Sequence, residues 1–394
     1  MHIPTDLPVP SPEEQAHSQR LIEHIRQEIQ QLGPISFARF MELALYQPGL
    51  GYYSAGLQKL GAQGDFITAP ELSPLFALCL ARQCEEVLRR LGGGDILELG
   101  AGSGRLAADL LLALAASDTL PERYAILEIS ADLRERQQAL LSQLPSRIHD
   151  RIVWLDRIPE KRFQGLVLAN EVLDVLPVQR FAKIDNKIIE LYIDWQDGLV
   201  WREIPADDDL TAGILALEAD LDAPLPDGYT SEINRHLEAW LRGVSAPLVK
   251  GAALFIDYGY PRREFYHPQR HMGSLLCHYR HRVHDNPLIH AGLQDITASV
   301  DFTAVADAAR ACDLDVAGYS TQAHFLIACG LAEQLTSLGE QEPERAMLLA
   351  QQVQRLTMPG EMGERFKVIA LARGYPAPLQ GFGRYDQRER LERP

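Results

Sequence analysis

The sequence predicts an α/β protein with a mostly parallel sheet and helices on both of its faces. Two observations predict this fold class. From residue 95 onward, short apolar runs alternate with stretches of helical periodicity, as in a doubly wound sheet. One of these runs, DILELG at 95–100, continues directly into the glycine-rich turn AGSG and a further helical stretch. A strand, a tight glycine turn and a helix in this order often bind nucleotide-like ligands.

Helices are predicted for most of the first ninety residues. Ser11 precedes a proline and two acids, which is typical of a helix start, and the apolar residues that follow recur at helical spacing. A second helix is expected at 36–46, before Pro48, and a third from Pro74 to Leu91. The segment between the second and third is rich in glycine and aromatic residues, and a loop of this length is usually functional.

The strands are expected in the following order. Five apolar runs predict parallel strands: DILELG, YAILEIS, RIVWLD, GLVLANE and AALFIDYG. Between the fourth and the fifth, period-two alternation around an Asp197-Gly198 turn predicts an inserted β-hairpin or small antiparallel sheet. Two later runs, DLDVAGYST and RFKVIALARG, add two more strands, and helical sequence at about 322–356 separates them.

Composition narrows the class of protein. The chain of 394 residues is 46% hydrophobic and 23% charged, as in globular proteins, and its net charge of −16 disfavours binding to nucleic acid. No apolar run approaches membrane-spanning length, and the N-terminus carries acids without the apolar stretch of a signal peptide. The five cysteines form no C-x-x-C pair, which indicates reduced thiols. We therefore expect a cytoplasmic protein that binds neither nucleic acid nor a membrane.

The glycine turn has a spacing that distinguishes between cofactors. Its glycines follow G-x-G-x-G, whereas the dinucleotide motif G-x-G-x-x-G would need glycine at Arg105 or at Ala107. The next strand ends at Glu128, whose carboxylate can accept hydrogen bonds from both ribose hydroxyls. Together these features resemble class I S-adenosylmethionine-dependent methyltransferases, whose Rossmann-like sheet has seven strands with the last antiparallel. A NAD site and a glycine turn without a ligand are the alternatives. The candidate cofactor residues here are Glu98, Gly100, Ala101, Gly102, Gly104 and Glu128.

Two further strand ends carry polar residues. Asp156 ends the third strand, where such folds often contact adenine, although an ordinary strand-end acid is the equal alternative. The fourth strand ends at Asn170, followed by Glu171 and Asp174, and these should face the same crevice as the glycine turn. If a helical turn begins there, the two carboxylates share a face and can bind a cationic nucleophile, bidentately if it is a guanidinium. Helix capping by Asn170 or Asp174 is the alternative.

A histidine-rich segment invites a metal hypothesis, which the spacing disfavours. His278, His281 and His284 are three residues apart, so on a helix they would turn progressively away from one face, and no cysteine motif accompanies them. We expect no metal and a solvated or substrate-facing loop. The full set of histidines in this segment is His267, His271, His278, His281, His284 and His290.

Longer segments resemble one family, the MidA-like S-adenosylmethionine-dependent methyltransferases, whose mitochondrial members are arginine methyltransferases needed for respiratory complex I assembly. They span most of the chain from about residue 33 to 374 and read GYY, GDFITAPELSPLF, LELGAGSG, NEVLDVLPVQRF, DYGY, GSLLCHYRH, HDNPLIHAGLQDITASVDFT and GERFKVIALARG. The chain departs from relatives at Ala101 and Ser103, where a proline and a larger or charged residue are common. It also has Ser299 where a histidine is frequent, which puts a catalytic role there in doubt.

The resemblance implies S-adenosylmethionine as cofactor and an arginine-carrying protein as substrate. Glu171 and Asp174 would orient the guanidinium and hold its charge during transfer. The weaker catalytic candidates are Asp257 and His281, and the substrate candidates are Glu71 and Tyr258. Glu71 as a helix cap and Asp257 as a loop anchor are alternatives. The cofactor candidates Asp65 and Thr68 belong to the early GDFITAPE loop, which we expect to cover the cofactor. Asn170 is a further cofactor candidate.

Other functions remain open on the sequence alone. A protein that binds S-adenosylmethionine without turnover and acts as an assembly factor is one alternative, and methylation of a small molecule is another. Methylation of nucleic acid is disfavoured because the sequence reads NEVL, not NPPY. The oligomeric state is open, with a homodimer among the options. We expect a helical region with an active-site loop at 1–94, a methyltransferase domain at 95–374 with an insertion at about 178–248, and a tail at 375–394.

Overall fold

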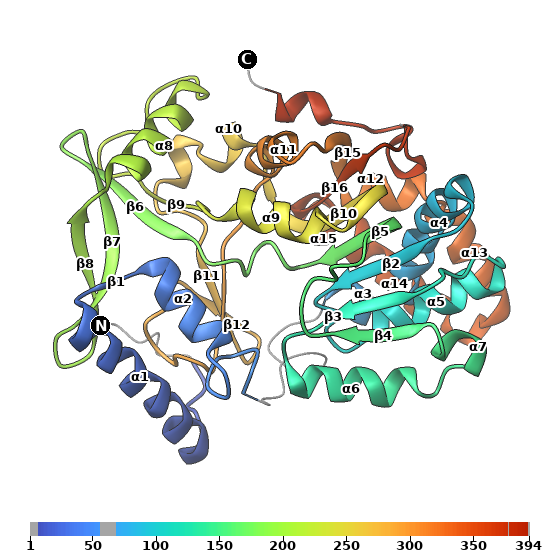
Figure 1. Ribbon diagram of the computed structural model, residues 1–394, viewed down its shortest axis with the longest axis horizontal. Helices are drawn as coiled ribbons and strands as arrows, with labels where there is room; N and C mark the ends of the chain where they lie inside the picture. Colours follow the sequence, from blue (N-terminus) through green and yellow to red (C-terminus); the bar gives the residue numbers. More distant parts are fainter. Residues whose placement is uncertain (1–6, 56–67, 377, 393–394) are drawn as a thin grey trace.

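The computed structural model describes residues 7–55, 68–376 and 378–392, and its largest element is a mixed sheet (Figure 1). The strand order is β15-β16-β10-β5-β2-β3-β4. Strands β10, β5, β2, β3 and β4 are parallel neighbours, whereas β16 runs antiparallel to both β10 and β15. The bounds are β2 (Asp95–Leu99), β3 (Tyr124–Leu127), β4 (Ile152–Leu155), β5 (Phe163–Asn170), β10 (Leu248–Tyr260), β15 (Asp315–Thr321) and β16 (Phe366–Arg373). A short eighth strand, β14 (Val300–Asp301), pairs with β10 beside this seven-strand path. The predicted α/β fold is confirmed.

Helices cover both faces of this sheet, because its strands are apolar on both sides. One face carries α4 (Pro74–Leu91), α5 (Arg105–Ala116), α12 (Gln322–Ala328), α13 (Leu331–Gln341) and α14 (Ala346–Thr357). The other face carries α9 (Leu237–Ser245) and α11 (Phe302–Ala311). Three further helices belong to this part of the fold: α6 (Ala131–Leu141), α7 (Ser146–His149) and α15 (Met362–Arg365).

The predicted insertion is a separate antiparallel sheet with the strand order β1-β7-β6-β9 and β8 on β7. Its strands are β1 (Ile35–Ser36), β6 (Gln179–Ile184), β7 (Lys187–Trp195), β8 (Leu199–Pro205) and β9 (Thr230–Ile233). Helix α8 (Asp208–Ala219) lies between β8 and β9 in the chain. Helices α1 (Pro12–Leu32) and α2 (Phe37–Tyr46) pack on this sheet. The first ninety residues therefore contribute to two cores, since α4 packs on the large sheet. The domain boundary at residue 94 stays a prediction.

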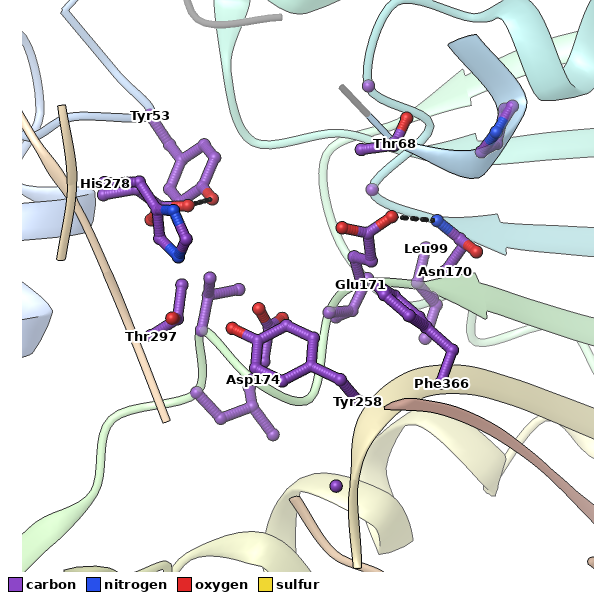
Figure 2. Close-up of a pocket in the computed structure, with 18 of the residues that line it drawn as sticks. Tyr53, Thr68, Leu99, Asn170, Glu171, Asp174, Tyr258, His278, Thr297 and Phe366 are labelled. Carbon is purple, nitrogen blue, oxygen red and sulfur yellow. Dashed lines mark hydrogen bonds between the residues drawn. The ribbon is translucent and has the colours of Figure 1, made fainter. Parts of the chain in front are cut away.

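The histidine-rich segment folds as a three-stranded sheet with the order β12-β11-β13, where a helix was considered in the sequence. It consists of β11 (Leu276–Tyr279), β12 (Arg282–His284) and β13 (Asp295–Thr297). Leu275, Cys277 and Ile296 anchor it to the same core as α2. This small sheet therefore brings residues near 278 and 297 beside the carboxyl ends of the large sheet, where Figure 2 places them.

The last described residues lie along β15, the edge strand of the large sheet. The backbone N–H of Gln387 donates to the carbonyl of Tyr319, and the Arg388 guanidinium donates to the carbonyl of Val316. Two short 3-10 turns, η3 (Gln380–Phe382) and η4 (Arg388–Leu391), carry this segment. Within the described ranges, no helix combines the length and the apolar character that crossing a bilayer requires.

Candidate active site

A cavity of about 770 Å³ opens at the carboxyl ends of β2, β3, β5 and β10. The chain passes from β2 to β3 and β4 on one side and returns to β5 on the other side of β2, so β2 lies at the switch point of the sheet. Ligands of open α/β sheets bind at this position. The glycine turn, both strand-end acids of β2 and β3, and the segment after β5 line the cavity together.

The glycine turn has a backbone that only glycine adopts easily. Gly100, Gly102 and Gly104 have φ angles of +63°, +55° and +87°, all in the left-handed region. Gly104 is the residue just before α5, and a Cβ atom there would lie 3.3 Å from the Cα of Gln137. The turn therefore presents its backbone closely to the cavity, with Ala101 in the lining.

Two buried acids flank the glycine turn in the sequence, Glu98 before it and Glu128 after it. Glu98 accepts a hydrogen bond of 2.8 Å from the Tyr124 hydroxyl, and burial raises the pKa of Glu98 to about 7. Glu128 accepts bonds from the backbone N–H of Ser130 at 2.9 Å and from the side-chain amide of Gln137 at 3.0 Å. Both carboxylates are thus fixed in place by neighbours in the chain while they line the cavity. A cradle of left-handed glycines with a fixed carboxylate at the next strand end fits an adenosine-containing cofactor.

Asn170 ends β5 and Glu171 follows it, and their side chains lie next to each other in the cavity (Figure 2). Glu171 has φ +54°, which is uncommon outside glycine and concentrates at functional sites. The Asn170 amide donates to Oε1 of Glu171 at 3.1 Å, and the Asn170 Oδ1 atom is buried without a hydrogen-bond partner among the described residues. Burial, and then the nearby Asp174, raise the pKa of Glu171 to about 8, against the opposing effect of the Asn170 hydrogen bond.

The segment after Glu171 is a turn and not the helix that the spacing of the two acids allowed. Oδ2 of Asp257 accepts backbone N–H bonds of 3.1, 2.9 and 3.2 Å from Val172, Leu173 and Asp174. Asp257 is fully buried and is not one of the described residues that line the cavity. The structure therefore places this catalytic candidate under the turn, in the anchoring position that was its alternative.

Asp174 lines the cavity from that turn. Its side chain is buried, and its Oδ1 atom has no hydrogen-bond partner of good geometry among the described residues. Burial raises the pKa of Asp174 to about 6, while the Tyr258 hydroxyl acts in the opposite direction. Two carboxylates, those of Glu171 and Asp174, thus share one water-poor space beside the glycine turn, as the sequence predicted.

The opposite wall of the cavity was not predicted from individual residues. Figure 2 shows Tyr53, His278 and Thr297 across the open centre from Glu171 and Tyr258. The Tyr53 hydroxyl donates to Oδ2 of Asp295 at 3.0 Å, and its ring stacks on Tyr46 at 5.7 Å. The signal in the sequence was the family resemblance of the segments GYY, GSLLCHYRH and HDNPLIHAGLQDITASVDFT, which contain most of these residues.

Two predicted site residues lie elsewhere. His281 occupies the exposed turn between β11 and β12 with φ +61°, whereas His278 points toward the cavity (Figure 2). Burial lowers the pKa of His278. Asp156 has a side chain that is 88% exposed and pairs with Arg134 at 2.8 Å, outside the described lining. Its alternative as an ordinary strand-end acid fits this position.

The early loop is described only from Thr68 onward, and Asp65 lies outside the described residues. Thr68 lines the cavity and precedes the short helix α3 (Ala69–Leu72). Glu71 of α3 accepts a hydrogen bond from the hydroxyl of Ser103 in the glycine turn. Glu71 therefore contacts the glycine turn itself, while Tyr258 lines the cavity beside Asp174 as a substrate residue would.

Comparison with known proteins identifies the family. The sequence profile of a family described as "Putative S-adenosyl-L-methionine-dependent methyltransferase" matches residues 79–320. The chain belongs to this family. A protein from Burkholderia thailandensis, crystallised bound to S-adenosyl-homocysteine, has a structure similar to that of this methyltransferase, with a TM-score of 0.92. It is 43% identical, over 98% of this chain and 100% of that chain. S-adenosylmethionine is therefore the cofactor of this methyltransferase, as the glycine spacing predicted.

Curated relatives extend the comparison. This methyltransferase is 29% identical to the protein arginine methyltransferase NDUFAF7 homolog of Drosophila melanogaster, over 97% of this chain and 93% of that protein. It is 29% identical to the Homo sapiens protein arginine methyltransferase NDUFAF7, over 95% of this chain and 87% of that protein. Both relatives are named mitochondrial. The cytoplasmic location predicted from composition is contradicted by this comparison and is withdrawn.

Proposed function

We propose that this methyltransferase transfers a methyl group to the guanidinium of an arginine in a protein substrate. The observation that carries the proposal is the pair of buried carboxylates, Glu171 and Asp174, beside the glycine turn. A guanidinium is a planar cation with five N–H donors, and two adjacent carboxylates match its charge and its geometry. The curated relatives, named protein arginine methyltransferases, support this choice of substrate.

The cavity holds its carboxylates ready for a cation. The pKa values of about 8 for Glu171 and about 6 for Asp174 mean that the two groups resist being charged together without a positive partner. A guanidinium between them supplies that partner and takes the place of the proton on Glu171. Binding of the substrate cation should therefore release a proton near neutral pH.

Positioning provides much of the catalysis in such a site. The bound cofactor supplies an electrophilic methyl group on its sulfonium. Glu171 and Asp174 fix the guanidinium so that one nitrogen points at the cofactor side, and Asn170 keeps the Glu171 carboxylate oriented through its hydrogen bond of 3.1 Å. The two carboxylates also stabilise the charge as the nitrogen attacks.

The proton displaced from the attacking nitrogen needs an acceptor within the cavity. We assign this role to Glu171, because substrate binding leaves its carboxylate deprotonated and burial favours the return of a proton to it. His278 is the second acceptor, since its lowered pKa keeps the imidazole neutral and its ring faces the cavity (Figure 2). Both groups replace His281, which lies at an exposed turn.

A link to the assembly of a respiratory complex rests on the family resemblance alone and stays a prediction. The identity of the substrate can be approached without it. Cell extract incubated with the protein and methyl-labelled S-adenosylmethionine, then hydrolysed to amino acids, should yield labelled methylarginine. Label confined to small molecules would point to the alternative function, and binding without any transfer would point to an assembly factor.

The decisive variant is Glu171→Gln, with Asp156→Asn as the matched control. Glu171→Gln should reduce labelling of arginine about 100-fold or more while the affinity for S-adenosyl-homocysteine, measured by calorimetry, stays within about twofold. Asp156→Asn removes one exposed carboxylate and should change neither quantity. Equal loss of transfer and affinity would move Glu171 into the cofactor site, and loss of neither would contradict the proposal.

A further inference from the structure

Besides Arg105 at the start of α5, the cavity lining includes three arginines, and these come from separate elements. Arg270 ends the 3-10 turn η1 (Pro268–Arg270), Arg355 belongs to α14 and Arg365 ends α15. We call this set the arginine rim. Arg355 and Arg365 are exposed, and the Arg270 guanidinium lies 3.8 Å from the centre of the Tyr260 ring. None of the three forms an ion pair with a described residue, although the chain has a net charge of −16.

The arginine rim is joined to the substrate side of the cavity. Arg365 directly precedes Phe366, which pairs with Tyr258 in the register of β16 and β10, and the two rings lie 5.6 Å apart. The Lys367 ammonium donates to the carbonyl of Arg365 at 3.4 Å and fixes the backbone there. Because Tyr258 lies beside Asp174 at the cavity floor, the arginine rim is one aromatic pair away from the carboxylates (Figure 2).

The arginine rim is separated from the cofactor side by the order of the sheet. The glycine turn and Glu128 follow β2 and β3, whereas Arg365 precedes β16, with β5 and β10 between β2 and β16. The acids next to Arg365 in the chain, Glu361 and Glu364, are exposed and are not among the described lining residues. The cavity thus has an acidic floor and a basic mouth.

We propose that the arginine rim selects a target arginine whose neighbours in the substrate protein are acidic. This inference rests on the proposed function, because it assumes that an arginine enters the cavity to reach Glu171 and Asp174. Residues on either side of that arginine then remain at the mouth, where aspartate or glutamate side chains would meet unpaired guanidinium groups. The rim also rejects arginines in basic segments, since like charges repel there.

Peptide binding tests the proposal without needing turnover. Short fluorescent peptides with one central arginine, flanked by glutamate, glutamine or lysine, are titrated with the full-length protein saturated with S-adenosyl-homocysteine. We expect the glutamate peptide to bind about five- to tenfold more tightly than the glutamine peptide at low salt, with the difference shrinking at high salt. The double variant Arg355→Glu/Arg365→Glu should reverse this order, and Arg147→Glu, an exposed change on α7 outside the cavity lining, should preserve it.

Three further outcomes separate the possible failures. Equal affinity for all flanks would overturn the proposal. Binding of a single-stranded oligonucleotide as tightly as the glutamate peptide would also overturn it, because the arginines would then bind nucleic acid. Loss of affinity for S-adenosyl-homocysteine in the double variant would overturn it too, because the arginines would then bind the cofactor. The glutamate-flanked peptide could also bind equally well when its central arginine is replaced by lysine. That result would support the arginine rim and contradict the proposed guanidinium site.

Discussion

The cofactor side and the substrate side of the cavity differ in how their acids are held. On the cofactor side, Glu98 and Glu128 accept hydrogen bonds from Tyr124, Ser130 and Gln137. All five residues lie within one stretch of the chain, from β2 to α6. On the substrate side, the lining comes from segments near residues 53, 171, 258, 278 and 297, and the Asp174 Oδ1 atom has no partner there among the described residues.

This difference indicates that cofactor binding and the chemical step depend on different parts of the cavity. The acids of the cofactor side are held within the stretch from β2 to α6, and Glu71 of α3 joins the glycine turn from outside that stretch. The substrate side concentrates carboxylates whose pKa values are raised by burial, with repulsion from Asp174 adding to the effect at Glu171. Asp257 and the surrounding strands hold this arrangement in place. A substrate cation between the two carboxylates relieves that repulsion. Part of the favourable free energy of substrate binding therefore arises at the guanidinium that is to be methylated.

The largest effect should come from the anchor of the substrate side. Asp257→Ala leaves three buried or half-buried backbone N–H groups of the 172–174 turn without their acceptor. Each such group costs about 1–3 kcal/mol, so unfolding in urea should begin at lower concentration and transfer should be lost. Asp257→Asn keeps one accepting oxygen and should recover part of the stability. Wild-type activity in Asp257→Ala would show that the turn holds itself.

A smaller effect is expected from the cofactor side. Gly104→Ala places a Cβ atom 3.3 Å from Gln137 at φ +87°, which costs about 1–2 kcal/mol in the left-handed region. Calorimetry should show S-adenosylmethionine binding about tenfold more weakly. Gly213→Ala, in α8 with open space around it, is the control and should stabilise the protein slightly. Unchanged binding in Gly104→Ala would mean that the turn needs no glycine there.

A pH titration should also distinguish the substrate side of the cavity from the cofactor side. Protonated Glu171 is neutral and binds a guanidinium poorly, so affinity for the glutamate-flanked arginine peptide should rise as pH increases through about 8. Because the folded pKa of Glu171 lies above its usual value, the ligand-free protein should also lose stability as pH rises from about 5 to 8. Glu171→Gln should abolish the affinity slope and reduce the stability slope, which titrations and thermal unfolding across this range would measure. Part of the stability slope remains because Glu98 and Asp174, with pKa values of about 7 and about 6, also titrate in this range. An affinity slope that persists in Glu171→Gln would assign it to another group.

The smallest effects should come from two predicted residues that lie outside the cavity lining. Asp156→Asn and His281→Ala alter exposed side chains, so we expect less than about twofold change in cofactor affinity and in transfer. His278→Ala, on the same hairpin but facing the cavity, is the matched comparison for His281 and should reduce transfer. An equal loss of transfer activity in both histidine variants would indicate that His281 also takes part in catalysis.

The sequence was informative where the site is local in the chain. Gly100 to Gly104 and Glu128 follow a pattern that a single strand–turn–helix–strand unit requires, so reading along the chain finds them. The pairing of Tyr53 with Asp295 joins residues 242 positions apart, and no local pattern marks it. The spacing of Glu171 and Asp174 suited a helix, but three bonds to Asp257 hold that segment as a turn. Alternation along a hairpin, not helical spacing, turned His278 inward and left His281 at the turn.

The segment along β15 has a consequence for the behaviour of the protein in concentrated solution. Tyr385, Gln387 and Arg388 occupy the carbonyl and side-chain groups of an edge strand that would otherwise be open to another chain. A chain ending at Gly374 should therefore pair edge to edge with its copies, which light scattering at rising concentration would detect as growing particles. Residues 378–392 act in this sense as protection against aggregation.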